Sequence, residues 1–171
     1  ASTASTASTA STASTAKEVA NITAGRPLID KIAAALKAGD TTAARNAFDD
    51  HDAAWHGAEV YVNVRSLTLY LAIEADLQAK LKTGLDATPV NTADLMATAD
   101  ALAKRYDEAA ALAAKGPALN PLFDDLATVR FARADIAQVV TPALARNDVA
   151  RAKAGWTAFK AKYPAASALI K

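Results

Sequence analysis

The chain has 171 residues, 52% hydrophobic but only 6% aromatic, with 19 basic side chains, 18 acidic side chains and no cysteine. This length suffices for one domain with a hydrophobic core. The near balance of charge gives no electrostatic basis for binding nucleic acid, and the lack of cysteine excludes disulfides and thiolate metal sites. No apolar run approaches the roughly 20 residues that span a bilayer, so no transmembrane segment is expected.

The first 16 residues form a segment of their own. They repeat Ala-Ser-Thr five times and end in Ala16, without a charged or large side chain. Such a segment buries too little apolar surface to offset the entropy of ordering its backbone. We interpret it as a Ser/Thr-rich linker, an engineered tail or a run of placeholder residues, and we expect one domain over residues 17–171.

The rest of the sequence predicts an all-α protein. It is rich in alanine, poor in the side chains that strands favour, and its apolar residues recur at helical spacing. Pro27 suits the first turn of a helix, Gly39 its end, and Asp40 the N-cap of the next helix. An apolar stripe predicts that this second helix continues to about Lys82. The stripe comprises Phe48, Trp55, Val62, Leu69, Ile73 and Leu77.

Three further helices are predicted after a loop at residues 84–89. The third covers about 92–116, with Asn91 or Thr92 as its cap, and the fifth runs from an N-cap at Asp148 to a stop before Pro164. The fourth begins at Pro121. Its expected inward stripe is Leu122, Val129, Ile136 and Val140. Together these elements predict an antiparallel bundle of four to five helices.

An internal repeat accompanies this layout. Five residues recur in kind at a constant offset of 108: Leu36, Asp40, Arg45, Phe48 and Trp55 match Leu144, Asp148, Lys153, Trp156 and Tyr163. One interpretation is a duplicated helical hairpin, so that residues 28–55 and 136–163 fold alike. The other is that two alanine-rich helical hairpins resemble each other by composition alone.

The stretch DDHDAAWHGAEVYVN, residues 49–63, concentrates acidic side chains and both histidines on the second helix. At about 100° per residue, Glu59 falls inside the apolar arc, Asp52 falls within it or at its edge, and His56 flanks it. Asp49 and Asp50 are predicted to face away from the core. A carboxylate in the arc carries a heavy desolvation cost unless it meets a cation, a metal or several donors.

Arginines on the fourth helix offer one partner for Glu59. Arg133 lies on the predicted inward stripe and Arg130 lies beside it. In the first interpretation, Glu59 and one of these arginines form a structural ion pair across the bundle. In the second, a small organic ligand binds between the helices, with Tyr70 and Arg133 as its polar anchors.

A metal ion is the third possible partner. His56 and Glu59 lie one turn apart, and together with Asp52 they offer imidazole and carboxylate ligands that suit iron, manganese or zinc.

The sequence gives little support to an enzyme. It lacks a Gly-rich phosphate loop and a Gly-x-Ser-x-Gly elbow, and its only histidines, His51 and His56, are too close in sequence to serve two helices of a di-iron site.

The stretch LKAGDTTAARNAFDDHDAAWHGAEVYVNVRSLTLYLAIEADLQAKL, residues 36–81, resembles the helical hairpin of imelysin-like proteins and related extracytoplasmic domains of bacterial iron uptake. His56 and Glu59 match the His and Glu of the family's Gly-x-His-x-x-Glu motif, and Ala54 stands in place of its Gly. The resemblance implies a non-catalytic helical domain in the periplasm or at the cell surface that handles iron or another divalent metal. The alternative is a structural or interaction subunit of a larger assembly without metal, and either role allows a membrane-protein or assembly partner.

Overall fold

The computed structural model describes residues 14–170, which contain no strand and are mostly helical. The all-α prediction is confirmed. The interpretation of residues 1–16 falls mainly on residues 1–13, outside the described range, whereas residues 14–16 begin a helix that runs to residue 23. The elements that follow, η1 and η2 being π-helical, are α2 (Arg26–Lys37), α3 (Thr41–Arg65), α4 (Leu67–Leu71), η1 (Ala72–Gln78), α5 (Ala79–Asp86), α6 (Thr92–Lys115), α7 (Leu122–Ala134), η2 (Asp135–Val140), α8 (Thr141–Ala145) and α9 (Val149–Ala168).

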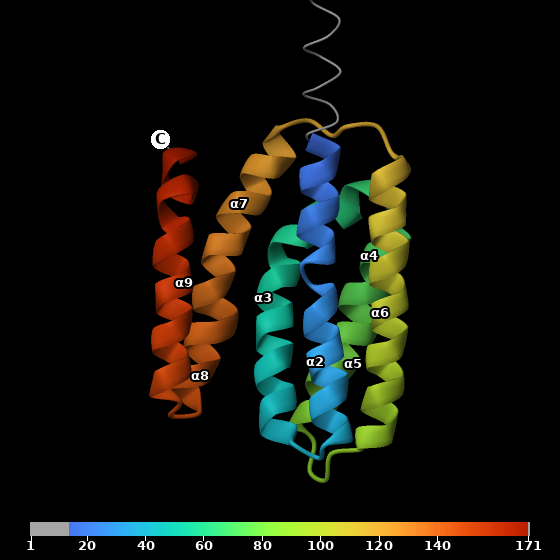
Figure 1. The fold of residues 1–171 in the computed structure, drawn as a ribbon, viewed down its shortest axis with the longest axis vertical. Helices are drawn as coiled ribbons and strands as arrows, with labels where there is room; N and C mark the ends of the chain where they lie inside the picture. The colour runs from blue at the N-terminus through green and yellow to red at the C-terminus, as the bar shows by residue number, and fades with distance from the viewer. Residues whose placement is uncertain (1–13, 171) are drawn as a thin grey trace, which may run out of the picture.

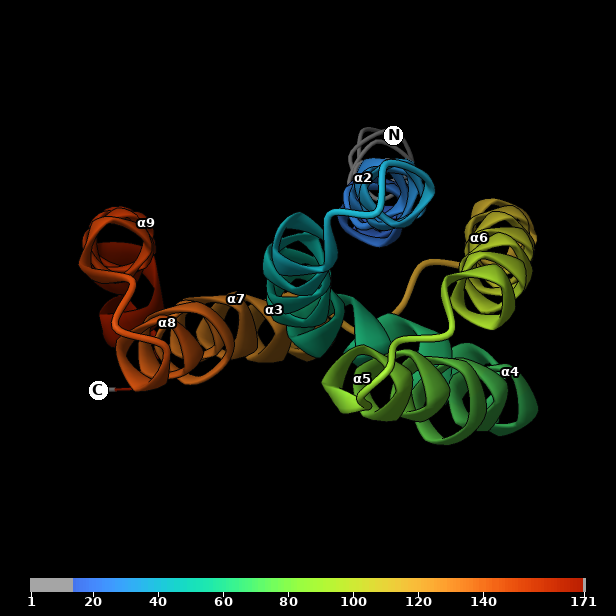
Figure 2. The same cartoon turned by 90° about the horizontal axis from the view of Figure 1, so that it is seen from below.

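The main hydrophobic core lies between α2, α3, α6 and the continuous rod α4–η1–α5 (Figure 2). Trp55, Tyr61 and Tyr106 are its largest fully buried side chains, and Ile32 and Leu102 pack in the same cluster. Each such side chain contributes roughly 1.5–3 kcal/mol by leaving water. The prediction of α6 is confirmed, and Asn91 caps it by accepting a hydrogen bond from the backbone N–H of Asp94 at 3.2 Å.

The second helix is shorter than predicted. It ends at Arg65, because Ser66 takes an extended conformation (φ −160°, ψ 102°) and its Oγ accepts the N–H of Leu69 at 3.2 Å. The chain then reverses, and α4–η1–α5 returns alongside α3 (Figure 1). A good N-cap residue therefore starts a new helix where the apolar stripe alone predicted continuation to Lys82.

The C-terminal hairpin consists of α7–η2–α8 and the returning α9. It packs on the side of α3 that lies away from α6 (Figure 2). A small separate cluster of buried apolar residues at this junction comprises Ala53, Ala134 and Val139. At the same junction Phe131 of α7 lies against Gly57 of α3, and Ala127 of α7 belongs to the main core.

Two helix turns in the chain share the same hydrogen bonds at the offset of 108. Gly39 (φ 73°) and Asn147 (φ 59°) both take the left-handed conformation. The next residue, Asp40 or Asp148, donates its N–H to the carbonyl five residues earlier, at 3.0 Å and 2.8 Å. Both aspartates cap the following helix through Oδ1, at 2.8 Å and 2.9 Å. Both N-cap predictions are confirmed, whereas superposition of 28–55 on 136–163 stays a prediction.

The last helix is longer than predicted, since α9 runs through Pro164 to Ala168. A proline inside a helix removes one backbone hydrogen bond, the one to the carbonyl four residues earlier. Pro164 and Lys160 are both exposed, so water can reach that carbonyl. The proline therefore does not end this outer helix.

Candidate functional site

Asp52, His56 and Glu59 lie on the side of α3 that faces α7 and η2. The imidazole Nδ1 of His56 lies 2.9 Å from the backbone carbonyl of Asp52 and 3.3 Å from its carboxylate. Its Nε2 lies 3.0 Å from the side-chain amide nitrogen of Gln138 on η2. These contacts suit a neutral ring that donates from Nδ1 and accepts at Nε2. The carboxylate of Asp52, the first of several causes, raises the pKa of His56 above its usual value.

Glu59 is buried and pairs with Arg130 of α7. The same guanidinium donates through Nε to the backbone carbonyl of His56 at 2.9 Å. Arg130 thus holds α7 against α3 with two contacts, one to a carboxylate and one to the backbone. The predicted structural ion pair is present, and Arg130 is its cation.

Arg133 does not join this site. It is exposed on α7, where it lines a groove with Val129 and Ile136. The predicted inward stripe of α7 was wrong in part, because Leu122 is 69% exposed. The positions that α7 and η2 bury instead are Ala127, Ala132, Ala134, Asp135 and Val139. Phe131 lies against Gly57 of α3, whereas Leu122 and Leu126 are exposed.

Tyr70 lies at the edge of the site, on α4. Its ring stacks on Trp55 with centroids 6.2 Å apart and planes 15° apart. It also lines a cavity of about 280 Å³ with Glu59 and Arg130. Tyr70 is thus placed as the ligand hypothesis requires, whereas Arg133, its proposed second anchor, is not.

Glu74 and Gln138 were missed as members of the site. Both lie in π-helical segments, which recur at functional sites in helical proteins. Glu74 accepts a hydrogen bond from the indole N–H of Trp55, and its charge contributes to the raised pKa of His56. No sequence signal marks a π-helical turn here, because both segments carry the apolar spacing of ordinary helices.

The three predicted metal ligands are only partly available in this arrangement. Asp52 and His56 lie together, but Glu59 is engaged by Arg130 and the Nε2 lone pair of His56 by Gln138. Within residues 14–170, no group of three or more His, Asp and Glu side chains is placed to hold a metal ion.

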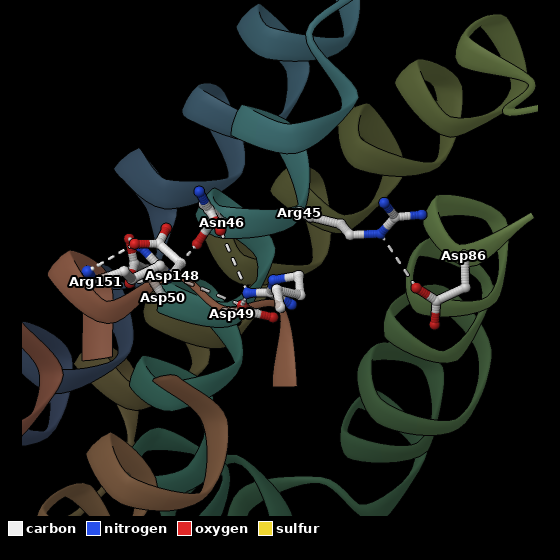
Figure 3. A network of polar contacts seen from close by, with 8 residues as sticks. Arg45, Asn46, Asp49, Asp50, Asp86, Asp148 and Arg151 are labelled. Atoms are coloured by element: carbon white, nitrogen blue, oxygen red, sulfur yellow. Dashed lines mark hydrogen bonds and ion pairs between the residues drawn. The ribbon is translucent and has the colours of Figure 1, made fainter. Parts of the chain in front are cut away.

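The acidic residues at the start of this stretch join α3 to the C-terminal hairpin (Figure 3). Arg151 donates to the carboxylate of Asp50 at 2.7 Å and to the backbone carbonyl of Asn46 at 2.6 Å, and Arg146 pairs with Asp49. Burial raises the pKa of Asp49, although Arg146 opposes the shift. The prediction that Asp49 faces away from the packed interior was wrong, because its side chain is only 13% exposed.

A groove of about 730 Å³ lies between the N-terminal helices, α3 and the C-terminal hairpin. Alanine is the commonest residue in its walls, with Leu28, Phe131 and Val139 as the larger apolar residues. Its charged edges are paired: Arg151 with Asp50, and Lys162 with Asp135 at 2.8 Å. The groove therefore has an apolar lining and a largely neutralised rim.

A second candidate surface covers the outer side of α8 and α9. Trp156, Phe159 and Tyr163 form a row in which successive ring centroids lie 5.2 Å and 5.3 Å apart. A groove of about 480 Å³, lined by Phe159, Tyr163 and Ile170, separates this row from α7 and η2. We name as the C-terminal apolar face the residues Leu144, Trp156, Phe159, Tyr163 and Ile170.

The chain matches no known protein family, no curated protein and no solved structure. In the described part of the chain, no helix combines the length and the apolar character that crossing a bilayer requires.

Proposed function

We propose that the protein is a non-catalytic helical module that binds a partner protein through its C-terminal apolar face. The observation that carries this proposal is the exposure of that face: Trp156 is 48% exposed, Tyr163 53% and Ile170 70%. Contiguous apolar patches of this kind are uncommon on monomers and mark interaction sites. Aromatic residues are also enriched at the centres of protein interfaces.

The polar groups on α3 support a structural role beside this face. Glu59 and Arg130 join α3 to α7, and Arg151 and Asp50 join α3 to α9. Each of these pairs fixes the position of the hairpin that carries the apolar face. A non-catalytic scaffold needs such fixed geometry, because a displaced hairpin would present a different surface.

Site-specific photocrosslinking in host cells tests the proposed function. A photoreactive amino acid replaces Trp156 in one variant and the exposed Lys104 of α6 in a matched control. We expect a discrete crosslinked species from position 156 and none from position 104. The further substitution Tyr163→Glu should abolish the crosslinked species from position 156. Absence of any adduct from position 156, with the protein folded and abundant, would refute the proposal.

As a second candidate function, we propose metal handling outside the cytoplasm, in the periplasm or at the cell surface. Its support is the contact between His56 and Asp52, at 3.3 Å, one turn from Glu59. Iron or another divalent metal would require Arg130 to release Glu59 and Gln138 to release the imidazole.

Thermal melts with and without added Fe²⁺ or Zn²⁺ test this second function. Bound metal stabilises the folded state by RT ln(1 + [L]/Kd), which is about 2.7 kcal/mol at a concentration one hundred times Kd. We expect the melting temperature of the wild type to rise and that of His56→Gln to stay unchanged. Indifference of the wild type to both metals would exclude the site.

A further inference from the structure

The apolar side chains of the internal repeat are buried in its first copy and exposed in its second copy, which lies 108 residues later. In the first copy the repeated apolar side chains are almost fully buried: Leu36 is 2% exposed, Phe48 6%, Trp55 0% and Val62 1%. In the second copy the equivalent side chains are about half exposed or more: Leu144 is 55% exposed, Trp156 48%, Tyr163 53% and Ile170 70%. Within residues 14–170, the second half of the repeat therefore has an apolar face, equivalent to the inward face of the first, that no helix covers.

The first copy is covered by two helical rods. One is α4–η1–α5, which runs antiparallel to α3, and the other is α6, which packs along α2 (Figure 1). Side chains along α3 meet the first rod at matched heights: Trp55 donates to Glu74 near its middle, and Arg45 donates to the carbonyl of Leu85 at its end. The inward face of the first copy is thus covered by two helical rods, one of which runs antiparallel to α3.

Charge at the edge of the face gives the direction of the missing helix. Arg45 contacts the C-terminal turn of α5 through the carbonyl of Leu85 and through Asp86 at 3.2 Å (Figure 3). Its equivalent in the second copy, Lys153, is exposed and makes no ion pair within residues 14–170. A cation is stabilised by the free carbonyls and negative end of a helix C-terminus. The missing helix should therefore end near Lys153.

We propose that another molecule of this protein covers the C-terminal apolar face, so that two identical chains form a dimer with two-fold symmetry. This deepens the proposed function and rests on it. The partner's α9 lies antiparallel to α9 and takes the place of α5, so that its C-terminal turn meets Lys153. The partner's η2 and α8 take the place of α6. Each hairpin thereby supplies the two helices that the other lacks, as an isologous contact requires.

The size of the face suits such a contact. Half-exposed large side chains offer on the order of 100 Å² each, so Leu144, Trp156, Tyr163 and Ile170 give about 400 Å² per chain, to which the less exposed Phe159 adds. Val129 and Ile136, which line the adjoining groove, extend this area. Stable interfaces bury about 800 Å² per partner and concentrate their affinity in buried Trp and Tyr residues.

Analytical ultracentrifugation of the purified full chain over a wide concentration range tests the dimer. We expect a reversible monomer–dimer equilibrium in the wild type. Trp156→Glu should weaken association at least about 30-fold, as loss of a central aromatic anchor does. Lys153→Glu should weaken it by a smaller factor. Leu112→Glu, which alters an apolar residue of α6 that is 38% exposed, is the matched control and should dimerise like the wild type.

Two results would overturn the dimer. One is a wild type that stays monomeric at every concentration, and the other is equal weakening by Leu112→Glu and Trp156→Glu. The photocrosslinking experiment separates this failure from failure of the proposed function. Adducts from position 156 to a different protein, with a monomeric wild type, would refute the dimer and keep the function. No adduct at all would refute both.

Discussion

At the scale of residues, the described part of the protein buries polar groups in two different ways. Glu59 is buried against Arg130, whose side chain stays 42% exposed. His51 is fully buried among Phe48 and Tyr106, and neither of its ring nitrogens has a hydrogen-bond partner within residues 14–170. A paired charge and an unpaired imidazole respond differently to mutation and to pH, so each leads to a prediction.

Removing Arg130 should destabilise the protein more than removing Glu59. Arg130→Met leaves a buried carboxylate without its cation and should cost about 3 kcal/mol. Glu59→Gln leaves a guanidinium that water can reach, so it should cost only about 1–2 kcal/mol. The double variant Glu59→Leu with Arg130→Met should lie closer to the wild type than Arg130→Met does. Urea denaturation of all four proteins measures these differences, and equal losses in both single variants would contradict the asymmetry.

His51 should make the folded state sensitive to mild acid. Burial lowers its pKa from 6.5 to about 4, against the opposing charge of Asp52. The unfolded chain therefore takes up the proton first as pH falls. The contribution of neutral His51 to stability is complete above about pH 6.5 and is lost between there and pH 4. The loss amounts to about 3 kcal/mol.

Urea denaturation of wild type and His51→Phe between pH 7 and pH 4.5 isolates this effect. The variant should lose less stability over that interval. His56→Gln is the control, because the raised pKa of His56 stabilises the folded state fully below pH 6.5, and this stabilisation is lost as pH rises above 6.5 through the higher folded-state pKa. Parallel pH profiles for wild type and His51→Phe would show that the imidazole is not held neutral.

At the scale of elements, local hydrogen bonds determine where helices begin and end. Asp40, Asn91 and Asp148 cap their helices as their residue types indicate, and Ser66 interrupts an apolar stripe that would otherwise continue. Gly39 and Asn147 occupy equivalent left-handed positions with different side chains. This difference allows backbone conformation to be tested separately from packing, since nothing lies within 4 Å of a Cβ placed on Gly39.

Gly39→Ala should destabilise the protein by about 1 kcal/mol, because alanine disfavours positive φ. Gly39→Asn should cost less, since asparagine adopts this conformation more readily and does so at the equivalent position 147. Thermal melts of the two variants beside the wild type provide the comparison. An alanine variant as stable as the asparagine variant would show that the turn changes its conformation.

At the scale of the whole molecule, the two hairpins are supported unequally. The first is enclosed by a core that includes Trp55, Leu102 and Tyr106. Of the second hairpin, α7 joins this core through Ala127, Phe123 and Phe131, whereas η2 joins only a small cluster with Ala53 and Ala134, and no residue of α9 belongs to either cluster. Elements with few buried apolar contacts open at lower free energy than the global transition. The C-terminal hairpin, and α9 above all, is therefore expected to open at the lowest free energy.

Amide hydrogen exchange in the monomeric Trp156→Glu variant should show α9 opening before α3 and α6. Leu102→Ala, which removes a fully buried side chain, should lower the protection of α3 and α6 by about 2–5 kcal/mol and change that of α9 little. Val139→Ala should lower protection mainly in α9 and η2. Uniform protection across all helices would show that the two hairpins unfold as one unit.

The sequence by itself determined the features that depend on neighbouring residues. Alanine-rich segments with apolar spacing predicted an all-α chain, and the caps at Asp40 and Asp148 follow from hydrogen bonds that span three to five residues. The repeat could be predicted for the same reason, because its two turns are closed by those local bonds. The burial of Glu59 also followed, since Trp55 and Val62 flank it on one helical arc.

Tertiary structure alone decided which faces are covered and which arginine meets Glu59. A helical arc gives the orientation of Trp156 and Tyr163 relative to their own helix, but their burial depends on helices that pack against it from elsewhere. Arg130 rather than Arg133 pairs with Glu59, because the face of α7 that packs on α3 carries the buried Ala127 and Ala134 and Arg130 lies beside that face. Which faces are buried, and which arginine pairs with Glu59, depends on the packing of segments that are distant in the sequence. The spacing of residues within one helix does not specify that packing.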